Sequence, residues 1–137
     1  MKIFVDTNVI LDFFLARRAQ KKAITELFEQ IYKERIEAFT SASCITDIYY
    51  ITAKRLGYIR ARDVLIDLLR ILGIVAVDGN DCVKALNLPI VDYEDSLVLT
   101  CASKAGISYI VSNDKDFLSV RTPLVQHGSI VALHYSD

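Results

Sequence analysis

Short apolar runs alternate along the chain with longer segments in which apolar residues recur every three or four positions. Short runs of this kind are typical of strands buried on both faces, and the helical spacing is typical of amphipathic helices. The pattern predicts strands at residues 3–5, 37–40, 74–77, 109–111 and 130–133. It predicts helices at residues 8–16, 20–34, 43–56, 62–72, 81–88 and 92–105. Strands that alternate with helices predict an α/β sandwich around a parallel sheet.

Capping and helix-breaking residues indicate where several of these helices begin and end. Ser43 is a candidate N-cap, because its hydroxyl can accept a backbone N–H at a helix start. Gly57, Gly73 and Gly106 follow the last apolar positions of three helices and are expected to end them. Pro89 is expected to break the helix before it.

Length and composition indicate one globular domain over residues 1–137. The chain is 53% hydrophobic and 24% charged, which is enough apolar material for one substantial core. It has five glycines and two prolines, and no linker-like stretch or repeat marks a domain boundary.

The charge balance excludes some classes of protein. Sixteen Lys and Arg residues face 17 Asp and Glu residues, for a formal net charge of −1. This excludes a nucleic-acid binder with a basic arm and a protein with an acidic tail. It leaves open an enzyme of nucleic acids whose acids and bases occupy different regions of one surface.

Cysteines and the N-terminal segment indicate a cytoplasmic protein without a membrane span. The three cysteines are an odd number, and their spacing fits neither a disulfide framework nor a metal knuckle. The apolar segment at residues 3–16 is interrupted by Asp6, Asn8 and Asp12, which a signal-peptide core or membrane helix would not tolerate.

Two predicted strands run directly into polar residues. Strand 3–5 is followed by Asp6, and strand 109–111 is followed by Ser112 and Asp114. Ligand sites of parallel sheets lie at the carboxyl ends of the strands, so these residues are expected to face one crevice. Taken singly, Asp6 is equally well explained as a helix cap and Asp114 as a turn residue.

A third acid, Asp95, lies on the apolar side of its predicted helix. At 100° per residue it falls between Val98 and Leu99, so its carboxylate is directed inward and needs a partner. The alternative is a capping box in which Asp92 caps the helix and Asp95 reciprocates. Both can hold, with Asp92 structural and Asp95 pointing into the crevice.

Other acids lie near predicted helix starts. Asp47 lies at the edge of an apolar helix face, and by itself it is better explained as an acid that interacts favourably with the helix dipole. Asp12 and Glu94 have the same explanation.

Together these residues resemble the PIN domain family. The resemblance rests on residues 6–12 (DTNVILD) after an apolar strand, on Asp95 opening an apolar helix, and on residues 110–117 (IVSNDKDF). It covers essentially the whole chain. It implies a three-layer α/β/α sandwich with a central parallel sheet of four to five strands. It also implies a metal-dependent ribonuclease, such as the VapC toxins of toxin–antitoxin pairs, with a cognate antitoxin as partner and a homodimer as a further possibility.

The resemblance assigns roles to individual residues. It makes an acidic quartet of Asp6, Asp47, Asp95 and Asp114, which is expected to hold metal and carry catalysis. Asn8, Ser112 and Asp116 are expected to support these acids. Two positions depart from the family. Asp47 is one methylene shorter than the usual glutamate, which allows contact with metal through water, and Ser112 replaces the usual threonine but keeps the hydroxyl.

Physical chemistry explains why such acids would gather. Close carboxylates raise one another's pKa, and a divalent cation relieves that repulsion. Oxygen ligands without Cys or His favour Mg²⁺ or Mn²⁺. Such an ion can bind the scissile phosphate and activate a water molecule, without a covalent intermediate.

Substrate binding is less specifically encoded. Two basic clusters could meet the phosphates of RNA, although solvated surface is an equally good explanation of each. The first contains Arg17, Arg18, Lys21 and Lys22, and the second contains Lys54, Arg55, Arg60 and Arg62. Tyr49, Tyr50 and Tyr58 near the second cluster could stack on bases, although burial in the core is the more common use of tyrosine.

Two other functions remain open. A receiver-like phosphoacceptor domain would use Asp78 after the third strand and Lys115, but it leaves the inward Asp95 unexplained. A catalytically degenerate PIN-like module would bind RNA without cutting it, which the shorter Asp47 allows.

Overall fold

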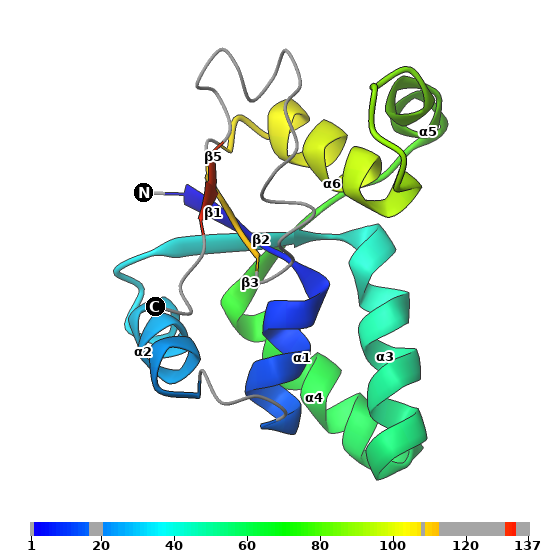
Figure 1. Ribbon diagram of the computed structural model, residues 1–137. Coiled ribbons are helices and arrows are strands. Elements are labelled where there is room, and N and C mark those ends of the chain that lie inside the picture. Colours follow the sequence, from blue (N-terminus) through cyan, green and yellow to red (C-terminus); the bar gives the residue numbers. More distant parts are fainter. Residues whose placement is uncertain (1, 17–20, 108, 113–130, 134–137) are drawn as a thin grey trace.

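A five-stranded parallel sheet forms the centre of the protein (Figure 1). The computed structural model describes residues 2–16, 21–107, 109–112 and 131–133. The strands are ordered β3-β2-β1-β4-β5 across the sheet, and each pairs in parallel with its neighbours. Their bounds are β1 Lys2–Val5, β2 Glu37–Ser41, β3 Leu72–Val75, β4 Tyr109–Val111 and β5 Val131–Leu133.

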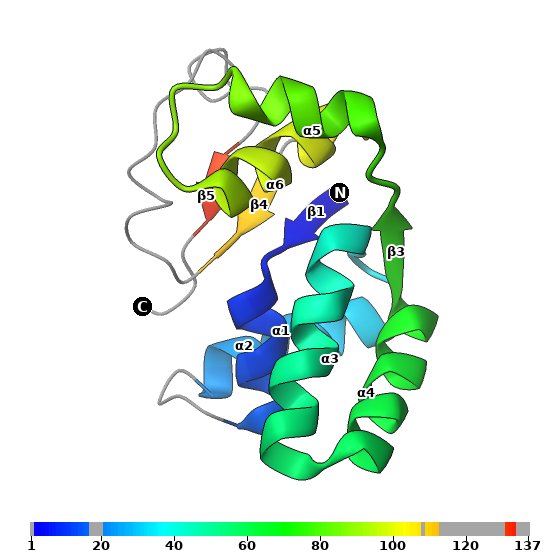
Figure 2. The same cartoon turned by 90° about the vertical axis from the view of Figure 1, so that its right-hand side faces the viewer.

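Six helices of the described ranges lie on the two faces of this sheet. They are α1 Thr7–Leu15, α2 Lys21–Tyr32, α3 Ala42–Leu56, α4 Tyr58–Ile71, α5 Gly79–Leu86 and α6 Tyr93–Lys104. Helices α1 to α4 lie on one face, and α5 and α6 lie on the other (Figures 1 and 2). Parallel strands are joined by right-handed crossovers, so connections that run in opposite directions along the sheet place their helices on opposite faces. The predicted three-layer α/β/α sandwich is confirmed.

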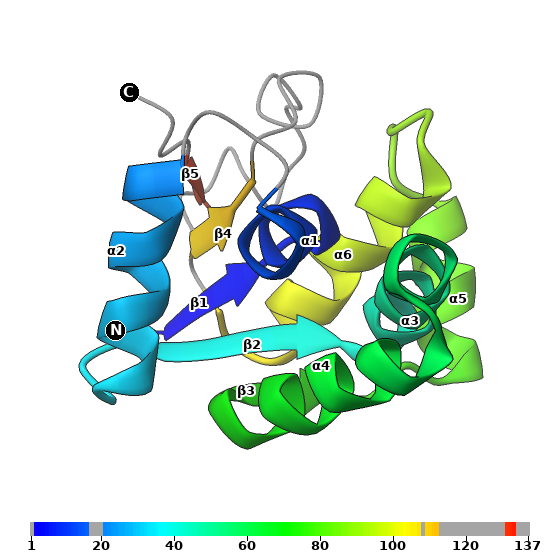
Figure 3. The same cartoon turned by 90° about the horizontal axis from the view of Figure 1, so that it is seen from below.

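The strand order reverses between β1 and β4. The chain leaves β1 toward β2, whereas it leaves β4 toward β5 on the other side (Figure 3). Such a reversal opens a crevice at the carboxyl ends of the two strands. Val5 and Val111, their last residues, are paired in register. Asp6 and Ser112 therefore enter the crevice side by side.

The central strands are apolar because both faces of the sheet are covered. Ile3, Phe4 and Val5 are buried, as are Ile110 and Val111. A strand covered on both faces reads as a continuous apolar run. That pattern was visible in the sequence, and it places the site at the edge of a rigid core.

Two expected helix boundaries are wrong. Helix α3 begins after Ser41, and the predicted N-cap Ser43 lies inside the helix, where its Oγ is 2.7 Å from the Oγ of Ser41. Helix α4 begins at Tyr58, directly after Gly57 with its φ of 88°, and not at residue 62. The α3–α4 turn is therefore tighter than the sequence suggested.

The third strand is also shifted from its predicted position. It spans Leu72–Val75 and not 74–77, and Gly73 lies within it, paired with Phe39 of β2. A Cβ atom at position 73 would lie 2.6 Å from the Phe39 ring, which explains glycine there. The expectation that Gly73 ends a helix is wrong. Glycine is required at this position because the Phe39 ring comes too close for a side chain.

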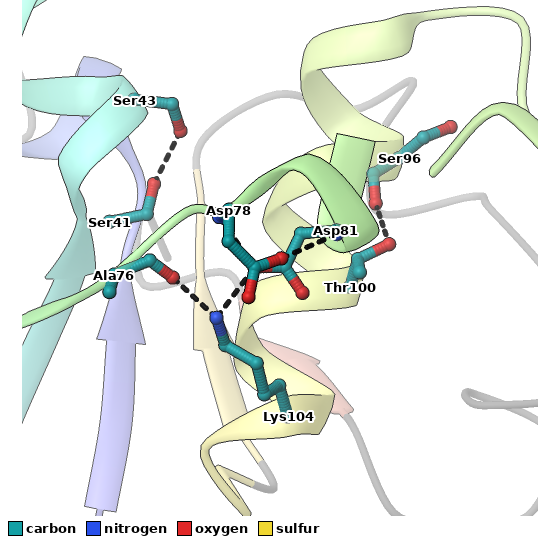
Figure 4. A network of polar contacts seen from close by, with 8 residues as sticks. All are labelled: Ser41, Ser43, Ala76, Asp78, Asp81, Ser96, Thr100 and Lys104. Carbon is teal, nitrogen blue, oxygen red and sulfur yellow. Dashed lines mark hydrogen bonds and ion pairs between the residues drawn. The ribbon is translucent and has the colours of Figure 1, made fainter. Parts of the chain in front are cut away.

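A network of polar contacts joins the end of β3 to α5 and α6 (Figure 4). The Lys104 ammonium of α6 donates to the Ala76 carbonyl and to the Asp81 carboxylate. Asp81 and Asp78 form a reciprocal capping box at the start of α5.

Among the described helices, none combines the length and the apolar character that crossing a bilayer requires.

Candidate active site

Asp6 stands at the junction of β1 and α1. It is the N-cap of α1, and its Oδ1 accepts a hydrogen bond from the backbone N–H of Thr7 at 2.8 Å. Its Oδ2 accepts a hydrogen bond from Ser112 Oγ at 2.9 Å. Its own N–H donates to the carbonyl of Val111 at 3.0 Å. The capping role does not remove Asp6 from the crevice, because both carboxylate oxygens are held there.

Asp95 lies in the first turn of α6. The carboxylate of the N-cap Asp92 accepts the backbone N–H of Asp95 at 3.3 Å. This is the cap expected of Asp92, and its donor is the backbone N–H of Asp95. Asp95 is half-buried, and the helix beyond it is buried from Ser96 to Ala102.

Asp47 comes from the second turn of α3. It is half-buried and lies close in the helix to Cys44 and Ile51, which face the same cavity. Helix α3 is packed against α1, so Asp47 reaches the crevice from a different side than Asp95.

These three acids line one cavity of about 590 Å³ at the carboxyl end of β1. Asn8 of α1 lines it as well. Its other described walls are Thr7, Ser43, Cys44, Ile51, Asp92, Tyr93, Glu94, Leu97 and Val98. No Lys, Arg or His is among the described lining residues. The fold thus gathers acids from three distant segments into a cavity without a balancing cation in its described walls.

Glu94 also lines this cavity, although the sequence predicted only a favourable interaction with the helix dipole for it. Partial desolvation raises the pKa of Glu94, and the neighbouring carboxylates of Asp47, Asp92 and Asp6 raise it further. Glu94 and Asp47 line the same cavity. The sequence does contain a local signal for Glu94, because three acids within residues 92–95 are more than the cap and the dipole of one helix require. The other residue explained in this way, Asp12, is buried in α1 and is not among the cavity residues.

Several predicted site residues lie elsewhere or outside the described residues. Asp114 and Asp116 lie outside the described residues, as do Arg17 and Arg18. Lys54 and Arg55 are exposed in the last turn of α3 and are not among the cavity residues. Seven residues of helix separate Asp47 from Lys54, a rise of about 10 Å.

The donor set fits a hard divalent cation. The negative charges of Asp47, Asp92 and Asp6 raise the pKa of Glu94, and a divalent cation would relieve this repulsion. Within the described ranges, no group of three or more Asp, Glu, His or Cys side chains is arranged so that it could hold a metal ion by itself. An open set of oxygen donors suits Mg²⁺ or Mn²⁺, because Mg²⁺ retains several water ligands.

Comparison with known proteins identifies the family. The PIN domain model matches residues 2–116, which include the segment around Asp114. The chain belongs to the PIN domain family. The resemblance seen in the sequence is thereby confirmed. This PIN domain is 32% identical over 123 residues to Ribonuclease VapC1 of Aquifex aeolicus (strain VF5), and the match covers 86% of this chain and 85% of that protein.

Solved structures share the fold of this PIN domain. DNA-bound VapBC from Salmonella typhimurium matches with a TM-score of 0.72 and 17% identity, covering 98% of each chain. VapC20 of Mycobacterium tuberculosis, described as a sarcin-ricin loop cleaving toxin, matches with a TM-score of 0.68 and 18% identity. That match covers 84% of this chain and 92% of that one. At these identities the likeness concerns the fold.

Proposed function

We propose that this PIN domain is a metal-dependent endoribonuclease that hydrolyses phosphodiester bonds in RNA, as the toxin of a VapBC-type toxin–antitoxin pair. The observation that carries the proposal is the convergence of Asp6, Asp47 and Asp95 on one cavity at the switch point of the sheet. Family membership and the relative named Ribonuclease VapC1 support RNA as the substrate.

The acids have complementary roles in this proposal. Asp6, Asp47 and Asp95 hold Mg²⁺ or Mn²⁺ together with Asp114, which the sequence assigns to the same set. The bound ion supplies charge neutralisation at the phosphate and a more acidic water molecule as nucleophile.

Neighbouring groups orient the first acid. Ser112 and the Thr7 N–H each hold one oxygen of Asp6, so its carboxylate enters the cavity in a fixed orientation. Asn8 offers an amide at the cavity wall to a phosphate oxygen or water. Asp116 remains assigned as a supporting acid from the sequence alone.

The proposal includes a protein partner and a location. Relatives of this fold were solved as VapBC assemblies from Rickettsia felis, Salmonella typhimurium and Haemophilus influenzae. We therefore expect a cognate antitoxin, encoded by a short reading frame immediately upstream, and a cytoplasmic setting. Co-expression of that reading frame should give a stable complex with this chain, and failure of the two chains to associate would contradict this part of the proposal.

The test of the enzyme is cleavage of a single-stranded RNA in Mn²⁺ by the wild type, Asp6→Asn and Asp95→Asn. Asn retains the cap of α1 at position 6, and Asp92 caps α6 through the backbone of residue 95, so both variants should fold. We expect each to lose more than about 100-fold in rate, because removing an outer partner of a metal ligand alone costs roughly 10–100-fold. Chelation by EDTA should abolish wild-type cleavage.

Retained activity in either variant, or cleavage in EDTA, would refute the assignment. Binding of Mn²⁺ and RNA without cleavage by the wild type would instead favour the degenerate binding module. The receiver-like alternative depended on Asp78, which the structure uses to cap α5.

A further inference from the structure

One wall of the proposed site carries an aromatic ring that the acids do not account for. Tyr93, the first residue of α6, lines the same cavity as the three converging acids. The residue is 40% exposed, so burial in the core does not explain its side chain. A divalent cation such as Mg²⁺ is held by oxygen ligands and needs no aromatic neighbour. The ring is therefore a feature of the cavity that cation binding leaves unexplained.

A hydrogen bond fixes the position of this ring. The Tyr93 hydroxyl donates to the backbone carbonyl of Cys82 at 2.9 Å. Cys82 belongs to α5, which packs beside α6 on the same face of the sheet (Figure 2). A side chain held at its backbone and at its hydroxyl has few orientations left. The ring can therefore bind a flat ligand at a small cost in conformational entropy.

Apolar side chains continue the wall beside Tyr93. Leu97 lies one turn further along the same side of α6, and Ile51 and Val98 also line the cavity. The cavity has a volume of about 590 Å³, whereas a cation with a full shell of about six waters would fill roughly 200 Å³, at about 30 Å³ per water. The cavity thus has room and apolar surface for a flat organic group next to the ion.

An unpaired nucleobase fits this combination of an aromatic ring and apolar walls. Single-stranded RNA is recognised largely by stacking of its bases on aromatic side chains, and any base can stack because each has a π face. The described walls contain no Lys, Arg or His, which a site for a free anion would use. A neutral base, in contrast, meets no charge repulsion from the acids.

We propose that Tyr93 forms a subsite for one unpaired nucleobase of the RNA, beside the phosphate that the cation binds. The inference rests on the proposed function and deepens it, because it names the part of the substrate that the apolar wall receives. It also requires that the RNA is single-stranded at the cleaved bond, since a base inside a duplex is not free to stack on the ring.

The test measures KM and kcat for cleavage of a short single-stranded RNA in Mn²⁺ by the wild type, Tyr93→Leu and Tyr93→Phe. Leucine removes the ring, whereas phenylalanine keeps it and removes only the hydrogen bond to Cys82. We expect Tyr93→Leu to raise KM by at least about fivefold with kcat little changed, because one stacked base is lost. Tyr93→Phe should stay within about twofold of the wild type, because the stacking ring remains.

The matched control is Tyr32→Leu on α2. Tyr32 is 47% exposed and is not among the cavity residues, so its loss should leave KM unchanged. Thermal melting verifies that each variant is folded. An unchanged KM in Tyr93→Leu would overturn the subsite. A loss in Tyr93→Phe equal to that in Tyr93→Leu would also overturn it, because Tyr93 would then act only as a structural link to α5.

RNAs with a single abasic nucleotide test the subsite without any change in the protein. For the wild type, an abasic nucleotide next to the cleaved bond should raise KM about as much as Tyr93→Leu does. The two changes together should cost no more than either alone, because both remove the same contact. If no abasic position next to the cleaved bond raises KM, or if the two losses add, the subsite is overturned.

These outcomes are distinct from a failure of the proposed function. If the wild type cleaves no RNA in Mn²⁺, the proposed function fails, and fluorescence anisotropy with the same RNAs then decides the subsite from binding alone. If the wild type cleaves RNA and Tyr93→Leu matches Tyr32→Leu, only the inference about Tyr93 fails.

Discussion

At the scale of single residues, Asp6 combines a structural and a chemical role. One carboxylate oxygen caps α1 through the Thr7 N–H, and the other accepts a hydrogen bond from Ser112. The same carboxylate lines the cavity at the carboxyl end of β1. Asp6 therefore acts as a helix cap and faces the proposed site at the same time.

Ser112 is expected to matter through Asp6. It is fully buried at the end of β4, and its hydroxyl fixes one carboxylate oxygen of Asp6. Ser112→Ala should lower the RNA cleavage rate by about 10–100-fold, because the carboxylate loses an orienting partner. The loss of stability should be only about 1 kcal/mol. Ser112→Thr, which keeps the hydroxyl, is the control, and a rate in Ser112→Ala equal to that of Ser112→Thr would contradict the role.

At the scale of elements, Lys104 ties the layer of α5 and α6 to the sheet. It links the chain after β3 to α5 through the Ala76 carbonyl and the Asp81 carboxylate (Figure 4). The Lys104 ammonium is the main cause that lowers the pKa of Asp81, and Asp81 in turn raises the pKa of Lys104. This network anchors the C-terminal end of α6 to α5 and to the chain after β3.

The Asp81 pKa predicts how this link depends on pH. Because its pKa in the folded protein lies below the usual 3.8, ionised Asp81 stabilises the fold above that value. The stabilisation is lost as the pH falls through the lowered pKa. Urea unfolding should show Asp81→Asn less stable than the wild type at neutral pH, with the gap closing at low pH.

Glu29 provides the matched control for Asp81. It pairs with Lys33 on an exposed helix face, with about half of each side chain accessible to solvent. Its pKa is also lowered, mainly by its hydrogen bond to Lys33. Glu29→Gln should change the urea midpoint little at neutral pH, since exposed ion pairs contribute little. Because the Asp81 side chain is only 3% exposed, an equal effect of the two substitutions would contradict the expectation that burial strengthens its ion pair.

Helix α3 carries the proposed site at one end and exposed aromatic and basic residues at the other. Tyr50 of α3 is 77% exposed and Tyr58, the first residue of α4, is 66% exposed, so burial in the core does not explain either side chain. Tyr50 and Lys54 lie three and seven residues beyond Asp47, on the same side of the helix. This side of α3 leads from the cavity toward the α3–α4 turn.

This geometry predicts that the exposed side of α3 contributes to RNA binding. Tyr50→Ala should weaken binding of single-stranded RNA by about 1–3 kcal/mol through loss of base stacking. Lys54→Gln should weaken binding and make the RNA affinity less dependent on salt, by the amount expected for the loss of about one phosphate contact. Filter binding in EDTA measures both, with Arg70→Gln on α4 as a charge-matched control. Unchanged RNA affinity in Tyr50→Ala would assign this surface to another role.

At the scale of the whole molecule, the near-neutral charge conceals an uneven distribution. The 17 acids include five that line the cavity, namely Asp6, Asp47, Asp92, Glu94 and Asp95. The rest of the molecule therefore carries more basic than acidic groups. A concentrated acidic cavity in a mildly basic body suits a protein that binds a cation and a polyanion together.

Folding stability should therefore depend on the divalent cation. Because only the folded chain gathers the acids, Mn²⁺ at 100 times its Kd should add about 2.7 kcal/mol to the free energy of unfolding. Thermal melting with and without Mn²⁺ measures the shift, and Asp95→Asn should lose most of it. An equal shift in Asp95→Asn would mean that Mn²⁺ binds elsewhere.

The order of elements could be predicted because its signals are local. Apolar runs marked the buried strands, and the alternation with helices implied a parallel sheet, which placed Asp6 and Ser112 at neighbouring strand ends. The boundaries around Gly57 and Gly73 were missed because both glycines have more than one structural use. Gly73 is required by the Phe39 ring of another strand, and no local pattern reveals that contact.

The sequence by itself determined the fold class, the family and three acids of the cavity, because these depend on periodicity and on residue types at strand and helix ends. Only the tertiary structure decided that Glu94 lines the same cavity as Asp47 and that Lys104 meets Asp81. A helical wheel gives the direction of a side chain from its own axis but not its distance from another helix. That distance is decided by how the layers pack, and it separates an acid that interacts with a helix dipole from one that enters the site.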